Sequence, residues 1–379
     1  METVLIIGGG IAGFSLAREI RKLNPNQQIT LLSRDTQLFD RDEFPRLLAD
    51  PTAKATVTDY ETLAQDLRLT LANCTVQSLD PVHHSVTTDQ GEFEADRIIL
   101  ATGSSPMLPS FSRDLPGLMT AVTHVNILEK VRARLGAIRD VAIVGGGVAG
   151  CEFANALATL GKHVTVIEQH GGPLFELMPI DARRHLIAEL EAIGVKFHFN
   201  ARCASACREG LRAQLSLTDG KRVEADLVIA AIGTVPNTKL AQAAGLNVGK
   251  GIIVDKRMET SHTHIYALGD CAEVAGMVLP YRAPIAYQAK ALAKTMNGVA
   301  TAVDYPPLPI SLNTPACPTM ISPPKRGAQG QWETLVVENG LNASFVDDYG
   351  RLSGFVLMGA ETVEVEFLKV EVPNWLNNI

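Results

Sequence analysis

The sequence has little of several features that would define other kinds of protein. It has six cysteines in 379 residues, and none of them forms a Cys-x-x-Cys pair. It has no long basic run, and 34 basic against 41 acidic side chains give a formal charge of −7, which disfavours a nucleic-acid or anionic membrane partner. No apolar run reaches the length of a membrane span, and no secretory signal is recognisable. We therefore expect a cytoplasmic protein with reduced thiols, no membrane partner and no metal site.

What the sequence does contain is an internal repeat. LIIGGGIAGFSL at 5–16 returns as AIVGGGVAGCEF at 142–153, and ADRIILATGSSPMLP at 95–109 is answered by ADLVIAAIGTVPNT at 225–238. Each unit opens with an apolar strand, a glycine turn and a helix, and closes with a second apolar strand and another glycine turn. Strands that alternate with helices predict a parallel sheet covered by helices.

Both opening loops have the spacing Gly-x-Gly-x-x-Gly. The first glycine permits a tight turn, the second lets the backbone approach a pyrophosphate, and the third lets helix and strand pack closely. The helix N-terminus adds unpaired N–H groups and a partial positive charge. One such motif is weak evidence, but two copies between apolar strands and helices predict two dinucleotide sites. The loop residues concerned are Gly8, Gly10, Ile11, Ala12 and Gly13 in the first unit and Gly145, Gly147, Val148, Ala149 and Gly150 in the second.

The residue that ends the next strand differs between the two units. In the second unit, HVTVIE ends on Glu168, whose carboxylate can accept hydrogen bonds from adenosine ribose hydroxyls. The next two residues include no arginine for a 2′-phosphate, which favours NADH over NADPH. In the first unit, QITLLSRD has Ser33 where an acid is expected, followed by Arg34 and then Asp35, the alternative acid. The other interpretation of Glu168 is a solvated carboxylate at a strand end.

A family resemblance enters at residues 251–274, which contain the string IYALGD. This string resembles the second flavin motif of the pyridine nucleotide–disulfide oxidoreductase superfamily. The resemblance implies that Asp270, after Gly269, binds the ribityl chain of FAD. The companion motif of that family is matched by Ala101, Thr102 and Gly103, with Gly233 at the equivalent place in the second unit. The resemblance therefore implies FAD at the first loop and NADH at the second.

The resemblance also implies the fold class and a domain order. We expect an α/β protein with two Rossmann-like dinucleotide-binding domains and a small α+β C-terminal domain. The FAD-binding domain would be split between 1–110 and 240–310, with the NADH-binding domain at 111–239 inserted. The C-terminal domain would occupy 311–379, where segments such as ETLVVEN and SFVDD predict strands. Because this domain is shorter than the dimerisation domain of the glutathione reductases, we expect a monomer.

Within this superfamily, two observations indicate the branch. Residues 39–50, FDRDEFPRLLAD, lack the redox cysteine of the disulfide reductases, and Cys151 has no partner, so electrons should leave the flavin directly. The strings NTPACPTMISPPKRGAQGQW, GRLSGFVLMGA and GCEFANAL resemble the bacterial rubredoxin reductases, which pass electrons from NADH to rubredoxin, a small acidic iron protein, in alkane hydroxylation or oxygen defence. The sequence departs from that pattern at Asp42, where proline is expected, and at Asn313, where relatives carry lysine.

The resemblance further implies residue roles. Hydride transfer from NADH to FAD needs no general base. Glu152 resembles the family glutamate near the nicotinamide, although a helix-face carboxylate is the alternative, and Arg41 would lie at the flavin edge. The helix beginning near Pro284 would direct its N-terminus at the flavin. A basic patch for rubredoxin is predicted from Lys325, Arg326, Arg41 and Arg46, with solvated charges as the alternative.

Other functions remain open at this point. The same chemistry would serve a ferredoxin reductase of an oxygenase system or a flavorubredoxin reductase of a nitric oxide system. A flavoprotein that uses NADH to switch a protein contact is a non-enzymatic alternative. An NADH oxidase or peroxidase is disfavoured by the missing active cysteine.

Overall fold

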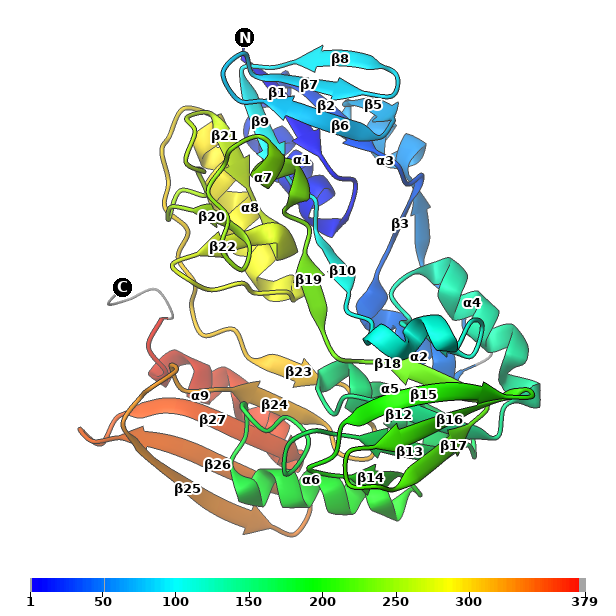
Figure 1. The fold of residues 1–379 in the computed structure, drawn as a ribbon. Helices are drawn as coiled ribbons and strands as arrows, with labels where there is room; N and C mark the ends of the chain where they lie inside the picture. Colours follow the sequence, from blue (N-terminus) through cyan, green and yellow to red (C-terminus); the bar gives the residue numbers. More distant parts are fainter. Residues whose placement is uncertain (1, 51, 375–379) are drawn as a thin grey trace.

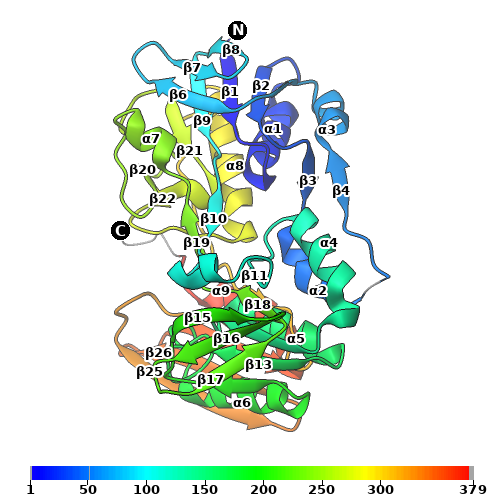
Figure 2. The same ribbon diagram turned by 45° about the vertical axis from the view of Figure 1, so that its right-hand side comes forward.

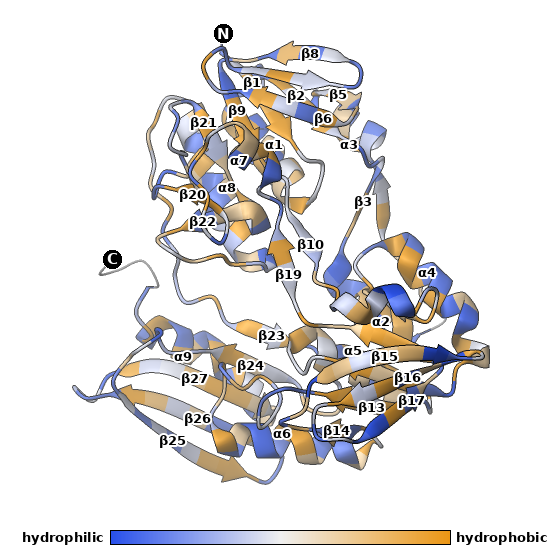
Figure 3. Cartoon of the chain, viewed as in Figure 1, coloured by the Kyte–Doolittle hydropathy of each residue, from blue (hydrophilic) through white to orange (hydrophobic). Residues whose placement is uncertain are grey.

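The computed structural model describes residues 2–50 and 52–374, and it confirms the predicted α/β fold class. The first sheet is entirely parallel, and its apolar strands are buried (Figures 1 and 3). Its strands are, in spatial order, β21 (Ile265–Ala267), β9 (Arg97–Leu100), β1 (Thr3–Ile7), β2 (Gln28–Ser33) and β5 (Thr70–Asn73). The helices beside it are α1 (Ile11–Leu23), α3 (Tyr60–Leu67) and α8 (Arg282–Met296), of which α1 packs against both others.

Smaller elements complete the first unit. A three-stranded antiparallel sheet is formed by β6 (Val76–Asp80), β7 (Ser85–Thr88) and β8 (Gly91–Glu94). Four more elements come from the later part of the chain: α7 (Lys239–Ala243), β20 (Ile252–Val254), the 3-10 turn η4 (Gly269–Cys271) and β22 (Ala272–Val274). Because β21 pairs with β9, residues far apart in sequence share one sheet and one core.

The second unit repeats the plan of the first. Its parallel sheet has the order β11 (Met119–Thr120), β18 (Leu227–Ala230), β12 (Asp140–Val144), β13 (His163–Ile167) and β14 (Lys196–His198). Its helical elements are η2 (Ser110–Asp114), α4 (Val125–Arg134), η3 (Leu135–Ala137), α5 (Val148–Thr159) and α6 (Ile180–Ala192). An antiparallel sheet of β15 (Cys203–Glu209), β16 (Arg212–Leu217) and β17 (Arg222–Ala225) packs beside it.

Two adjacent strands connect the units. The chain enters the second unit through β10 (Ser104–Pro106) and leaves it through β19 (Thr234–Pro236), and these strands pair antiparallel (Figure 2). Asn237, directly after β19, donates its side-chain amide to the carbonyl of Thr102 at 2.8 Å and accepts from the hydroxyl of Ser105 at 2.7 Å. The crossing is therefore fixed by side chains as well as by the strand pair.

One early segment packs on the second unit rather than on the first. After β3 (Gln37–Phe39) and the 3-10 turn η1 (Arg41–Glu43), helix α2 (Phe44–Ala49) packs against α4 and α5, and β4 (Val57–Asp59) returns to pair with β3. Phe44, Leu47 and Leu48 are fully buried in the core of the second unit. The predicted span 1–110 thus supplies a helix to its neighbour.

The C-terminal sheet is antiparallel and shares a core with the second unit. Its order is β23 (Ile310–Leu312), β24 (Thr319–Ser322), β27 (Leu352–Gly359), β26 (Gly340–Asp347) and β25 (Gly330–Val337), followed by η5 (Ala360–Glu364) and α9 (Val365–Glu371). Leu312, Leu341 and Val356 belong to the same buried cluster as the apolar side chains of α5 and α6. Within residues 2–50 and 52–374, no helix is both long enough and apolar enough to cross a membrane.

Candidate functional site

The first glycine loop lies between β1 and α1. Gly8 has φ +120°, and a Cβ there would stand 2.1 Å from the carbonyl oxygen of Ala101. A Cβ on Gly13 would stand 2.1 Å from the carbonyl oxygen of Gly8, whereas a Cβ on Gly10 would meet nothing within 4 Å. The first and third glycines therefore serve close packing, and the second leaves the backbone open to a ligand.

The second glycine loop, between β12 and α5, has the same geometry. Gly145 has φ +106°, and the Cβ of a residue at Gly150 would stand 2.0 Å from the oxygen of Gly145. Gly147 faces open space, as Gly10 does. Neither Gly10 nor Gly147, the N-cap residues, has a side chain that caps its helix, so the first N–H groups of α1 and α5 can bind phosphate oxygens. These residues fit a dinucleotide pyrophosphate at each loop.

The two strand ends differ as the sequence predicts. Ser33 is buried at the end of β2, and its hydroxyl accepts the backbone N–H of Asp35 at 3.2 Å. Arg34 and Asp35 are exposed. Tyr60 of α3 also hydrogen-bonds the Ser33 hydroxyl, and burial raises the pKa of Tyr60 to about 12, so the phenol stays neutral. At the end of β2 the buried polar groups are therefore the neutral hydroxyls of Ser33 and Tyr60, and the nearest carboxylate in the sequence, that of Asp35, is exposed.

In the second unit, Glu168 directly follows β13 and is buried. Its Oε2 accepts the backbone N–H of Gly146 at 2.7 Å. Its Oε1 accepts the backbone N–H of His170 at 2.9 Å and the imidazole Nδ1–H of the same residue at 2.8 Å. Three donors therefore fix this carboxylate at the mouth of the glycine loop, where a ribose hydroxyl can reach it.

Asp270, in η4, lies beside the first glycine loop. Its Oδ2 accepts the Arg41 guanidinium at 2.5 Å and the Ser104 hydroxyl at 2.7 Å. Gly269 has φ +78°, and its missing side chain lets η4 approach α1, since a Cβ there would stand 2.7 Å from the Cβ of Ala12. The structure thus brings three predicted residues, Asp270, Arg41 and Ala12, to one place.

The segment from Asp40 to Asp42 forms ion pairs with two later elements of the first unit. Asp40 pairs with Arg282, the first residue of α8. Arg41 pairs with Asp270, 229 positions away. Burial raises the pKa of Asp42, although the neighbouring Arg41 partly offsets the effect. Arg282 and Ser104 were not predicted from the sequence, and both lie at places that only the folded chain brings together.

Glu152 is buried on α5, and the C-terminal domain supplies its partner. Its Oε1 accepts the backbone N–H of Asn313 at 2.8 Å. Burial raises the pKa of Glu152, hydrogen bonds from Asn313 partly offset this, and the nearby carboxylate of Asp42 raises the pKa again. One turn further along α5, Asn155 accepts the backbone N–H of Ala316 at 3.0 Å. The two departures noted in the sequence, Asp42 and Asn313, therefore both act on Glu152.

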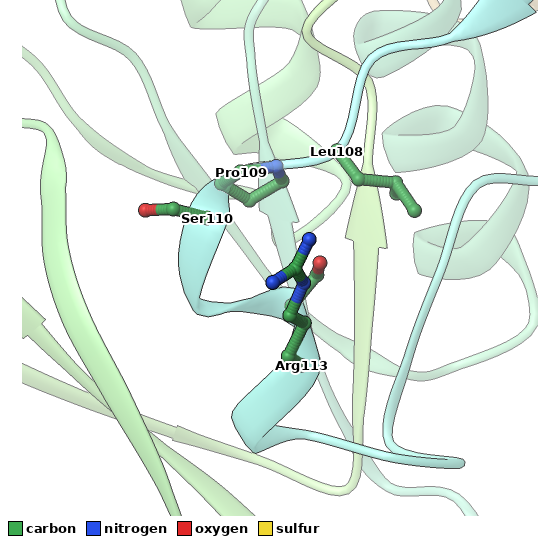
Figure 4. A pocket seen from close by; sticks show the side chains of 5 residues that line it. Leu108, Pro109, Ser110 and Arg113 are labelled. Atoms are coloured by element: carbon green, nitrogen blue, oxygen red, sulfur yellow. The ribbon is translucent and has the colours of Figure 1, made fainter.

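The remaining predicted residues are distributed over several elements. Thr102 hydrogen-bonds the carbonyl of Asn237 at 2.7 Å, while Gly233 has φ +96° just before β19. Arg46 of α2 lies 3.9 Å from Glu43. Lys325 and Arg326 lie in the turn between β24 and β25, far along the chain from Arg46. A pocket of about 420 Å³ lies at the segment that comes directly after β10 in the chain. Its lining residues are Leu108, Pro109, Ser110, Ser112 and Arg113 (Figure 4).

The loop between β13 and α6 adds an aromatic group to the second site. The imidazole of His170 stacks on the ring of Phe175 at 5.2 Å, with 16° between the planes. The guanidinium of Arg183, on α6, lies 4.5 Å from the centre of the Phe175 ring. Arg183 lies on α6, well beyond Glu168 in the chain, so the residues next to Glu168 in the sequence do not indicate it.

Comparison with known proteins shows the family to which the chain belongs. Residues 2–295 match the family described as pyridine nucleotide-disulphide oxidoreductase, and the chain belongs to this family. It is an oxidoreductase that uses FAD and NADH, as the two glycine loops and their strand-end residues predict. Residues 302–368 match a second family, described as rubredoxin binding C-terminal domain.

Individual relatives within this family include reductases of several electron carriers. The chain is 36% identical to the rubredoxin-NAD(+) reductase of Alcanivorax borkumensis, over 98% of this chain and 99% of the relative. It is also 36% identical to the nitric oxide reductase FlRd-NAD(+) reductase of Aeromonas hydrophila, over 94% of this chain and 92% of the relative. A solved ferredoxin reductase of the CYP199A2 system from Rhodopseudomonas palustris superposes with a TM-score of 0.87 at 25% identity, covering 98% of this chain and 95% of that one.

Proposed function

We propose that this protein carries electrons from NADH through FAD to rubredoxin. One observation carries the proposal: the C-terminal domain, which matches the rubredoxin-binding family, is bonded directly to α5, the helix that follows the second glycine loop. The overall reaction converts one NADH and two oxidised rubredoxins into NAD⁺, one proton and two reduced rubredoxins. FAD supplies the chemistry that links the two halves, because it accepts a hydride and releases electrons singly.

In this proposal each loop holds one dinucleotide. The N–H groups at the start of α1 bind the pyrophosphate of FAD, with Gly10 giving the backbone access. Asp270 accepts hydroxyl hydrogen bonds from the ribityl chain, while Arg41 and Ser104 hold its carboxylate in place. The N-terminus of α8, which begins at Arg282, stabilises negative charge on the flavin ring.

At the second loop, the start of α5 binds the pyrophosphate of NADH, and Glu168 accepts the adenosine ribose hydroxyls. Glu152 borders the nicotinamide, in a position fixed by the backbone of Asn313. The protein contributes orientation and electrostatics to hydride transfer, since no proton has to be removed from the substrate. Because the Asn313 side chain is neutral, this flavin environment lacks the positive charge that a lysine at position 313 would bring, while burial raises the pKa of both Asp42 and Glu152 and so disfavours their negative forms.

We further propose the division into domains given by the sequence, with 1–110 and 240–310 binding FAD, 111–239 binding NADH and 311–379 binding rubredoxin. The protein acts as a monomer in the cytoplasm. Support comes from the six cysteines, all of which are free thiols, as expected in a reducing compartment. Light scattering behind a sizing column tests the monomer: a mass near 40.7 kDa supports it, and a doubled mass contradicts it.

The function is tested by mixing catalytic amounts of the flavin-loaded protein with NADH and excess oxidised rubredoxin without oxygen. We expect loss of the rubredoxin colour at many turnovers per second, with two rubredoxins bleached per NADH consumed. The same mixture with NADPH should react far more slowly. Reduction of the flavin without bleaching of rubredoxin would retain the NADH site and refute the partner.

A second candidate is reduction of a flavorubredoxin or of its rubredoxin-like domain. The similarity to nitric oxide reductase FlRd-NAD(+) reductases at 36% identity favours it specifically. A competition assay with equal amounts of rubredoxin and flavorubredoxin separates the two candidates. A ratio of kcat/KM above about ten for either acceptor identifies it, since tenfold corresponds to about 1.4 kcal/mol of transition-state binding.

A further inference from the structure

We propose that Arg183 is a latent binding residue for the 2′-phosphate of a nucleotide, and that the carboxylate of Glu168 prevents its use. The inference rests on the assignment of the second glycine loop to the adenosine half of NADH. It does not depend on the identity of the electron acceptor. It concerns a charge that α6 delivers to the loop after β13, where the sequence alone indicated no cation.

The contacts place Arg183 at this site. Phe175 stacks with His170, and His170 in turn donates to Glu168, so the loop from 168 to 175 is one connected group. Arg183 lies over the Phe175 ring at 4.5 Å, and its Nη1 approaches the carbonyl oxygen of Gly171 at 3.5 Å. The guanidinium therefore touches the same loop whose other end holds the Glu168 carboxylate.

The hydrogen-bonding capacity of Arg183 is largely unused. Its buried Nε has no hydrogen-bond partner among the described residues. Its contacts are an aromatic face and one long approach to a carbonyl, with no carboxylate paired to it in the part of the chain that the structure describes. A guanidinium is planar, permanently charged and matched to the geometry of a phosphate, which binds two of its N–H groups at once. Burial lowers the pKa of Arg183, yet arginine keeps its charge at any working pH.

Glu168 explains why this group is not used. The carboxylate is buried and held by three hydrogen bonds, so it cannot turn away from an incoming ribose. A 2′-hydroxyl donates to it favourably, but a 2′-phosphate brings a second negative charge to the same point. Like charges at contact distance disfavour binding strongly in a site of low dielectric. Loss of the Glu168 charge should therefore remove the repulsion between its carboxylate and the 2′-phosphate, and should allow the phosphate to bind Arg183.

The charged neighbours of Arg183 differ in position, which supplies a matched control. Arg184 is the next residue on α6, is exposed, and lies 3.9 Å from Asp181. Arg184 has the same charge as Arg183 and lies on the same helix, but its ion-pair partner is Asp181 and not the loop after β13. A general effect of positive charge near the site would involve both arginines equally, whereas the proposal involves Arg183 only.

The test uses two fragments of the dinucleotide, 5′-AMP and 2′,5′-ADP, which differ only in the 2′-phosphate. Binding to the flavin-loaded protein is measured by calorimetry, so the readout is independent of electron transfer. The wild type should bind 5′-AMP more tightly. In Glu168→Gln, which keeps the shape and an acceptor oxygen, the affinity ratio should move toward 2′,5′-ADP by at least about tenfold.

The second change separates Arg183 from its surroundings. Adding Arg183→Gln to Glu168→Gln should abolish most of the gain in relative affinity for 2′,5′-ADP. Adding Arg184→Gln instead should change this relative affinity by less than about twofold. Equal affinity for 2′,5′-ADP with and without Arg183, or no gain in Glu168→Gln, would overturn the proposal. Flavin absorbance and retained 5′-AMP binding verify that each variant is folded. For a variant that loses 5′-AMP binding, Arg183→Lys in the same background replaces it, and this should keep part of the gain because the charge remains.

Discussion

The two glycine-loop units have nearly the same backbone and different side chains at one position. Gly13 and Gly150 approach the first glycine of their loops equally closely, and Gly10 and Gly147 both face open space. In contrast, β2 ends in the neutral Ser33, which hydrogen-bonds Tyr60 of α3, whereas β13 is followed directly by the fixed carboxylate of Glu168. In the proposed function, both the backbone N–H groups and the strand-end side chains face the ADP part that FAD and NADH share, so the two units differ in how they would bind the same adenosine ribose.

The largest expected effect comes from breaking each loop in turn. A side chain at Gly13 or Gly150 would place its Cβ about 2 Å from a carbonyl oxygen, so the backbone must move. Gly13→Val should yield a colourless protein without FAD. Gly150→Val should stay yellow and bind NADH at least about 100-fold more weakly. Flavin absorbance and NADH titration measure the two results, and circular dichroism serves as the folding control. Loss of flavin in both variants would show that the loops are not independent.

A smaller effect is expected at the crossing between the units. Asn237→Ala removes hydrogen bonds to Thr102 and Ser105, one on each side of the turn before β10. We expect a loss of about 1–3 kcal/mol in the free energy of unfolding, mainly because the part-buried carbonyl of Thr102 loses a donor, whereas the hydrogen bond to Ser105 is exposed and contributes less. Denaturant unfolding measures it. The exposed Asn247→Ala is the matched control, and an equal loss there would contradict the assignment.

Only the second unit carries a buried acid, Glu152, in the helix that follows its glycine loop, and the titration of this acid should be measurable. Burial raises the pKa of Glu152 in the folded protein, so the folded state binds the proton more tightly than the unfolded state. Stability from this group is therefore lost as pH rises from the unfolded pKa, near 4.5, through the raised folded pKa. Glu152→Gln, which stays neutral, should be more stable than the wild type at pH 7 by about 1–3 kcal/mol, because the wild type must bury a charged carboxylate. The difference should vanish below about pH 4, where both side chains are neutral, and a difference that is constant between about pH 4 and pH 8 would contradict the burial argument. Denaturant unfolding across this pH range gives the measurement.

The smallest effect is expected at the neutral strand end. Ser33→Ala removes the hydroxyl that accepts from Asp35 and pairs with Tyr60. We expect about 1 kcal/mol less stability and weaker FAD binding by less than about tenfold. Thermal unfolding with and without added FAD gives both values. A loss of FAD affinity of about 100-fold would instead assign Ser33 a direct contact with the ligand, as proposed for Glu168 in the other unit.

Local patterns predicted the parts of this protein that short segments determine. The turns at Gly8 and Gly145 depend on apolar strands and glycines within a dozen residues, and both have the expected form. Contacts between distant segments were not predictable. Nothing near Arg41 in the sequence identifies Asp270 as its partner, and nothing near Glu152 identifies Asn313. The packing of α2 on the second unit and the position of Arg183 on Phe175 likewise depend on tertiary contacts.

The paired strands β10 and β19 also bear on how such a chain can arise. Because entry and exit are neighbours, a whole unit can be inserted into a host without separating the strands on either side. The host sheet is indeed continuous across the insertion, since Ile98 of β9 pairs with Ile265 of β21. Duplication of one ancestral unit, followed by nesting of the copy inside the original, would give this arrangement in a single gene. Any later exchange of the inserted copy would have to preserve the core that it shares with α2 and with the C-terminal sheet, so these contacts, rather than the junction, limit how freely the second unit can be replaced.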